Sequence, residues 1–178
     1  MLNFLLAIAL GNPFPSLKPL SPELPALIAS TTPALRVRVD KKPYQLQGDF
    51  NNDRTPDTLL LVAVDRQLPP KIEVHSPWKL GQMVRLQIPE PLAIYIRHGS
   101  NGREFLLHNR DYFSTPQWQN ARLPMRIVTR RTPEHRRWFL QGADISGDGI
   151  LLTTEAGIDI LLFWDGVKYK VFFPRETP

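Results

Sequence analysis

An acidic stretch that runs directly into an apolar one constrains this chain more than any other feature. Oxygen-bearing side chains stand at alternate positions, at Asp49, Asn51 and Asp53, and Asp57 closes the series. The residues that follow, Thr58–Val64, form a continuous apolar run, which is typical of a strand buried on both faces. A tight loop can turn such alternating oxygens inward around one hard cation, and the strand then carries the chain into the core.

Most of the remaining chain repeats the strand signal. Short, mostly alternating segments predict strands at Leu35–Val39, Tyr44–Gln47, Lys71–His75, Met83–Ile88, Leu92–Arg97, Glu104–Leu107, Met125–Thr129, Gly149–Thr153, Ile158–Trp164 and Val167–Phe172. Gly99–Gly102 predicts a hairpin loop, and Asp165-Gly166 predicts a two-residue hairpin turn. Asn109–Pro124 predicts a long loop or one irregular helical turn. The 18 prolines also disfavour long helices. We therefore expect a mainly β fold of antiparallel sheets, blade-like or sandwich, with little helix.

The length of 178 residues predicts a single β-rich domain, which we place at residues 34–178. Residues 11–33 are rich in proline and predict an extended arm or linker. Residues 1–10 are apolar and include Ala-Ile-Ala at 7–9, which resembles the later part of a secretory signal with its basic start missing. The alternative is a short element that packs on the domain. No segment is long and apolar enough to predict a transmembrane helix.

The first acidic loop resembles the calcium loop of FG-GAP repeats, also called VCBS repeats, which occur in integrin α-chain propellers and many bacterial secreted proteins. The family pattern is Asp-x-Asn-x-Asp-Gly-x-x-Asp before an apolar strand, and residues 49–57 read Asp-Phe-Asn-Asn-Asp-Arg-Thr-Pro-Asp. The resemblance implies a Ca²⁺ ion held by side-chain oxygens of Asp49, Asn51, Asp53 and Asp57 and by the backbone carbonyl of Thr55. Arg54 replaces the family's glycine, a residue that adopts a left-handed backbone easily.

A second acidic loop lies at residues 144–155. Its spacing fits the EF-hand template, but the sequence predicts strands on its C-terminal side, so a degenerate FG-GAP-like turn is the better interpretation. The candidate ligands are Asp144, Ser146, Asp148, Ile150 and Glu155. Leu152 stands where the FG-GAP family has an acidic residue. For both loops the alternative is a metal-free turn, because Asp and Asn side chains also cap turns by hydrogen bonds to the backbone.

Arginines gather in one short part of the chain, beside His135 and Trp138. The cluster consists of Arg126, Arg130, Arg131, Arg136 and Arg137. Guanidinium groups beside an aromatic ring can bind phosphates or sulfated sugars, which agrees in sign with the formal net charge of +5. The alternative is a solvated basic loop. No nucleic-acid-binding motif accompanies the cluster, so a protein or polysaccharide partner is favoured over nucleic acid.

The sequence shows no catalytic motif. The chain has no cysteine, and its four histidines lack the spacing of a zinc site. Asp111 and Glu155 are candidates for an acid–base pair in a hydrolase with an unrecognised site. The expected function is therefore a secreted or periplasmic, non-catalytic β domain stabilised by calcium, with a binding or structural role. The alternatives are an anion-binding protein that uses the region Arg126–Arg137 and the hydrolase.

Overall fold

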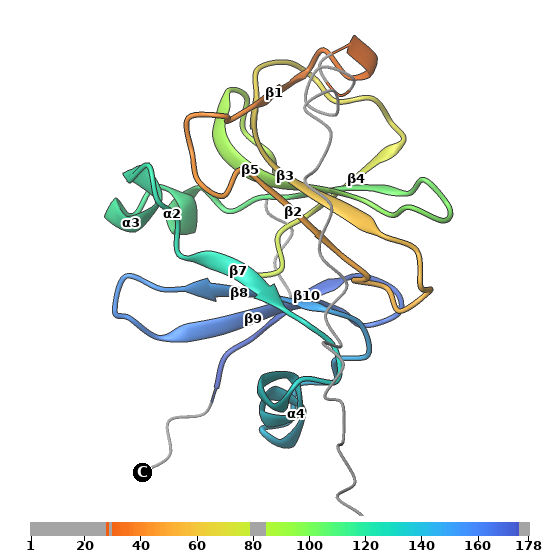
Figure 1. The fold of residues 1–178 in the computed structure, drawn as a ribbon. Helices are drawn as coiled ribbons and strands as arrows, with labels where there is room; N and C mark the ends of the chain where they lie inside the picture. Colours follow the sequence, from red (N-terminus) through yellow and green to blue (C-terminus); the bar gives the residue numbers. More distant parts are fainter. Residues whose placement is uncertain (1–27, 29, 79–84, 175–178) are drawn as a thin grey trace, which may run out of the picture.

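The computed structural model describes residues 28, 30–78 and 85–174, and these residues form two β-sheets and short helices (Figure 1). The predicted signal segment at residues 1–10 lies outside the described residues, as does most of the predicted arm at 11–33. At the end of the arm, Ile28 and Thr32 are buried, and Ile28 packs against the first sheet. Packing therefore begins upstream of Ala34.

The first sheet is built around β3 (Asp57–Val64) and β5 (Glu90–Arg97), which pair in antiparallel fashion. Its strand order is β1-β3-β5-β6-β4, and β2 also pairs with β3. The other strands are β1 (Leu35–Val37), β2 (Gln45–Gly48), β4 (Ile72–His75) and β6 (Glu104–Leu107). The pairing of β4 with β6 is parallel, and the other described pairings in this sheet are antiparallel.

The second sheet is a meander in the order β10-β9-β8-β7, with antiparallel pairing throughout. Its strands are β7 (Met125–Val128), β8 (Gly149–Thr153), β9 (Asp159–Trp164) and β10 (Tyr169–Phe172). The described helices are α2 (Arg110–Phe113), α3 (Pro116–Gln119) and α4 (Pro133–Leu140). The mainly β fold with two largely antiparallel sheets is thus confirmed.

The two sheets pack face to face as a sandwich. Leu59 and Leu61 of β3 belong to the same buried cluster as Ile150 of β8 and Leu162 of β9. Because side chains alternate across a strand, Leu60, Val62 and Val64 of β3 pack into a second cluster on the outer face. Burial on both faces, predicted for Thr58–Val64, is therefore confirmed.

Helix α4 covers the outer face of the second sheet, so this sheet lies between the first sheet and the helix (Figure 1). Trp138 is the residue that anchors it, and this side chain is buried against Leu161 and Phe163 of β9. The helix begins at Thr132, whose hydroxyl accepts a hydrogen bond from the N–H of His135 at 3.2 Å. The next residue is a proline, a residue favoured at the first helical position.

Three local predictions are wrong. Residues 85–88 of the predicted strand Met83–Ile88 are irregular, because the Arg110 guanidinium binds the carbonyls of Gln87 and Pro89, and residues 83–84 lie outside the described residues. The β9–β10 turn spans Asp165 to Lys168, since the Asp165 carboxylate accepts two backbone N–H bonds there. The irregular region predicted at Asn109–Pro124 contains two short helices, α2 and α3, in place of a loop or one helical turn.

A buried hydrogen bond joins the two sheets inside the core. His98, directly after β5, places its Nε2 2.9 Å from the hydroxyl oxygen of Tyr169 in β10. The imidazole also lies against Phe105 and Trp164, with ring centroids 4.9 and 5.0 Å away. Burial, helped by the nearby Arg103 charge, lowers the pKa of His98 from 6.5 to about 4. His98 is therefore neutral in the folded protein at neutral pH.

The low pKa of His98 predicts a loss of stability in acid. The unfolded chain takes up a proton at this residue near pH 6.5, whereas the folded state resists protonation until about pH 4. Its contribution is therefore present above pH 6.5 and decreases as the pH falls toward 4, by about 2 to 3 kcal/mol. The free energy of unfolding should be measured by urea denaturation at several pH values for the wild type and for His98→Gln. The difference between the two proteins should show this pH dependence, because the effects of most other titrating groups cancel in it. A pH-independent difference would contradict the prediction.

Candidate functional site

The acidic loop between β2 and β3 is closed from inside by Asp57. This residue is fully buried at the start of β3, and one carboxylate oxygen accepts from the N–H groups of Phe50 at 2.8 Å and Asn51 at 3.3 Å. Its other oxygen accepts from the N–H of Gly99 at 2.9 Å, which ties the loop to the β5–β6 hairpin. Burial raises the pKa of Asp57 to about 6 in spite of these donors.

The outer part of the loop is closed by its remaining acidic and amide side chains. Asp49 accepts from the N–H of Arg54 at 3.1 Å, and Asp53 accepts from the N–H of Thr55 at 2.8 Å. Asn51 donates to Asp53 at 2.6 Å, and Ser100 on the neighbouring hairpin also donates to Asp53. Arg54 has a φ of 69°, so the position that holds a glycine in the FG-GAP pattern is left-handed in this chain too.

The arrangement of these carboxylates is that of a hydrogen-bonded turn. Within residues 28, 30–78 and 85–174, no three His, Asp or Glu side chains are grouped closely enough to hold a metal ion. One atom fits a cation better than the rest: Oδ1 of Asp49 is buried and has no hydrogen-bond partner in the described structure. Calcium at this loop stays a prediction, and Asp49 is the residue on which its test depends.

The structure brings together only part of the second acidic loop. Asp144 and Ser146 are exposed before β8, and Asp148 is buried at the start of that strand. Ile150 lies within β8, where it pairs with Ile127 and Leu162. Glu155 lies beyond the other end of β8. Because a strand advances by roughly 3.3 Å per residue, the length of β8 keeps Glu155 too far from Asp144 to share a metal ion with it. The EF-hand ligand set therefore does not converge.

The two acidic loops contact each other through Asp148, and we call this contact the loop junction. One carboxylate oxygen of Asp148 accepts from the N–H of Asp49 at 2.9 Å, and the other accepts from the N–H of Arg130 at 2.6 Å. The N–H of Asp148 donates to the carbonyl of Asp49 at 2.8 Å. The residue before it must be Gly147, because a Cβ there would lie 2.2 Å from the carbonyl oxygen of Phe50.

The arginine cluster divides into bound and open members. Arg126 forms two hydrogen bonds with Glu134, at 2.7 and 2.6 Å, and Arg130 contributes its backbone N–H to the loop junction. The exposed Arg131, Arg136 and Arg137 line an open groove of about 900 Å³ along α4, which we call the α4 groove. Its lining is completed by Thr132, Pro133, His135, Phe139, Leu140, Gln141 and Ile145.

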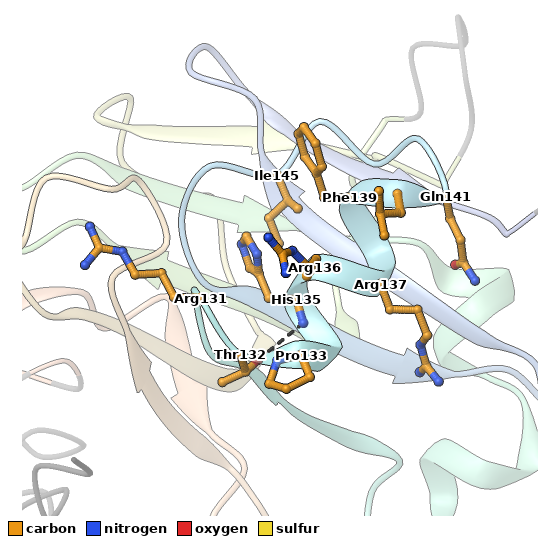
Figure 2. A pocket seen from close by; sticks show the side chains of 10 residues that line it. Arg131, Thr132, Pro133, His135, Arg136, Arg137, Phe139, Gln141 and Ile145 are labelled. Atoms are coloured by element: carbon orange, nitrogen blue, oxygen red, sulfur yellow. Dashed lines mark hydrogen bonds between the residues drawn. The ribbon is translucent and has the colours of Figure 1, made fainter.

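Figure 2 shows how the three arginines are spread along the α4 groove. Arg131 and Arg137 point away from each other, and Arg136 lies between them. His135 lies on the same helix, and its Nε2 is 3.0 Å from the carbonyl oxygen of Gly147. The α4 groove is therefore held in place by the same loop that forms the loop junction.

The sequence predicted the arginines of this site but not its apolar side chains. Phe139 and Leu140 complete the α4 groove, and only the helical conformation places them beside the arginines. The signal that could have revealed the helix is the sequence Thr132-Pro133-Glu134, which combines an N-cap residue, an N1 proline and an acidic first turn.

The candidate acid–base residues lie on different elements. Asp111 is in α2, and Glu155 is in the turn between β8 and β9.

The described part of the chain contains no helix of the length and apolarity that crossing a membrane would require. Comparison with protein-family models, with curated proteins and with solved structures finds no match to this chain.

Replacing Asp148 with Asn should weaken the loop junction. The Asn side chain has one acceptor oxygen, so its amide nitrogen faces one of the two backbone N–H donors that the carboxylate now accepts. We expect the free energy of unfolding to fall by about 2 to 3 kcal/mol in urea denaturation. The exposed Asp144→Asn in the same loop is the matched control and should change it by less than about 0.5 kcal/mol. Equal effects of the two variants would contradict the role of Asp148.

Proposed function

We propose that this chain is a non-catalytic binding domain that takes an acidic chain molecule in the α4 groove. The observation that carries the proposal is the set of exposed arginines, Arg131, Arg136 and Arg137, that line one groove. Glu134, the acidic residue of α4, is bound by Arg126 at 2.6 Å and forms a longer ion pair with Arg137 at 4.0 Å. One carboxylate shared in this way leaves most of the positive charge of the α4 groove for a ligand.

The spread of these side chains favours a long ligand over a single small anion. Arg131 and Arg137 point in different directions, so one phosphate or sulfate group cannot bind both (Figure 2). An elongated molecule with several negative groups can contact each arginine separately. Guanidinium groups keep their charge at all physiological pH values, so they suit the binding of anions and not proton transfer.

The proposal includes a location in the periplasm or outside the cell, which is supported by the resemblance of the first acidic loop to FG-GAP repeats.

Removing the arginines should abolish binding to a polyanion. We expect the wild type to be retained on immobilised heparin at about 50 mM salt and to elute as salt rises, because binding releases counterions. The triple variant Arg131→Gln, Arg136→Gln, Arg137→Gln should elute at much lower salt. At about 1 kcal/mol or less for each exposed charge pair, the loss is about tenfold to a hundredfold in affinity.

The matched control removes the same charge elsewhere. Arg36, Arg66 and Arg97 are exposed and belong to the first sheet or its connections, so their replacement with Gln lowers the net charge equally. This control should elute close to the wild type. Equal shifts for the two triple variants would mean that net charge alone governs retention, and an unretained wild type would remove the basis of the proposal.

We also propose that a Ca²⁺ ion stabilises the first acidic loop, and the unpartnered Oδ1 of Asp49 is the observation that favours it. Calcium at about a hundred times its dissociation constant should stabilise the wild type by roughly 2.7 kcal/mol relative to EDTA, visible as a higher melting temperature. Asp49→Asn and Asp53→Ala should lose this shift. The control Asp65→Asn, at an exposed carboxylate paired with Arg36, should keep it. Identical melting curves in calcium and EDTA would contradict the proposal.

A further inference from the structure

Two large apolar side chains share the α4 groove with the arginines. Phe139 is 57% exposed and Leu140 is 77% exposed, and both line the groove together with the buried Ile145. Single exposed apolar residues are ordinary on protein surfaces. An adjacent pair inside a basic groove is different, because arginines can bind an anionic ligand without any exposed apolar surface beside them. The pair therefore points to apolar groups on the ligand.

Helix geometry explains why these side chains face outward. Successive residues of an α-helix are about 100° apart, so the burial of Trp138 against β9 turns the next two residues away from the sheet. The helix then ends, and Gly142 follows with a φ of 100°. No further turn of α4 covers Phe139 and Leu140, so they remain available to a ligand.

The apolar pair also lies next to a positive charge. Arg136 precedes Phe139 by three positions and Leu140 by four, and residues at these spacings are neighbours on a helix surface. Each ligand segment that contacts this part of the α4 groove therefore meets a cation and apolar surface together. A ligand that matches it must carry anionic and apolar groups close to each other along its length.

We infer that the ligand of the α4 groove is an acidic peptide segment that also carries Leu or Phe side chains. The inference rests on the proposed function and names the class of partner. Sulfated polysaccharides match the arginines but bring no aliphatic group for Leu140. Single-stranded nucleic acid brings bases that stack on aromatic rings, but the α4 groove offers only Phe139 and the imidazole of His135, which already contacts the carbonyl oxygen of Gly147. A peptide of alternating acidic and apolar character satisfies both kinds of contact.

The test compares two fluorescent peptides of equal length and charge, one of repeated Glu-Glu-Leu-Phe units and one of repeated Glu-Glu-Ser-Ser units. Fluorescence anisotropy should show the wild type binding the apolar peptide about tenfold more tightly, as expected for burial of the exposed parts of Phe139 and Leu140. Phe139→Ser with Leu140→Ser should remove this preference, so that the two peptides bind with equal affinity. Because both side chains are exposed, this variant should keep the wild-type melting temperature.

The control variant replaces two exposed apolar residues outside the α4 groove, Val39→Ser with Val167→Ser, and should keep the preference. Equal binding of the two peptides, with heparin retention still dependent on the arginines, would overturn the peptide inference and leave the proposed function intact. Tighter binding of an oligothymidine with the same dependence on Phe139 would also overturn it, in favour of nucleic acid. If the wild type binds neither peptide and is not retained on heparin, the peptide inference and the proposed function are both overturned.

Discussion

The carboxylate of Asp148 is the contact on which the rest of this structure depends. The two sheets of the sandwich share an apolar core, but an apolar interface alone does not fix how the loops at one end meet. Asp148 accepts backbone N–H groups from both sides, one in the first acidic loop and one just after β7. A hydrogen bond is directional, so this carboxylate fixes the relative position of the loops where the apolar core does not.

The same junction connects the acidic and basic parts of the molecule. Arg130, which donates to Asp148, is followed directly by Arg131 at a φ of 66° and then by the start of α4. On the other side of the junction, Gly147 lies against the backbone of Phe50 and Asp49, where a Cβ would not fit, so the loops approach closely. Its carbonyl oxygen lies 3.0 Å from Nε2 of His135 in α4. The acidic residues thereby position the arginines of the α4 groove, although the two sets are separate features in the sequence.

Much of the fold follows from local patterns. The apolar run of β3 and the alternation of apolar and polar residues in the later strands predicted the sheets. This two-residue period can be recognised in a single segment, without knowing which strand pairs with it. The strand predicted at Met83–Ile88 fails in its described part since Arg110 binds the backbone carbonyls there, a contact between residues distant in sequence. The strand predicted at Gly149–Thr153 is β8, and it separates Asp144 from Glu155. The acidic spacing of that segment therefore fits the EF-hand template without forming its ligand set.

Amide hydrogen exchange measured by NMR tests the loop junction most directly. If Asp148 holds the two loops as the structure shows, the amides of Asp49 and Arg130 should exchange as slowly as those of the central strands β3 and β8, through global unfolding. Exchange at the rate of the exposed Asn52 amide would contradict this account. The loops would then open independently of the core.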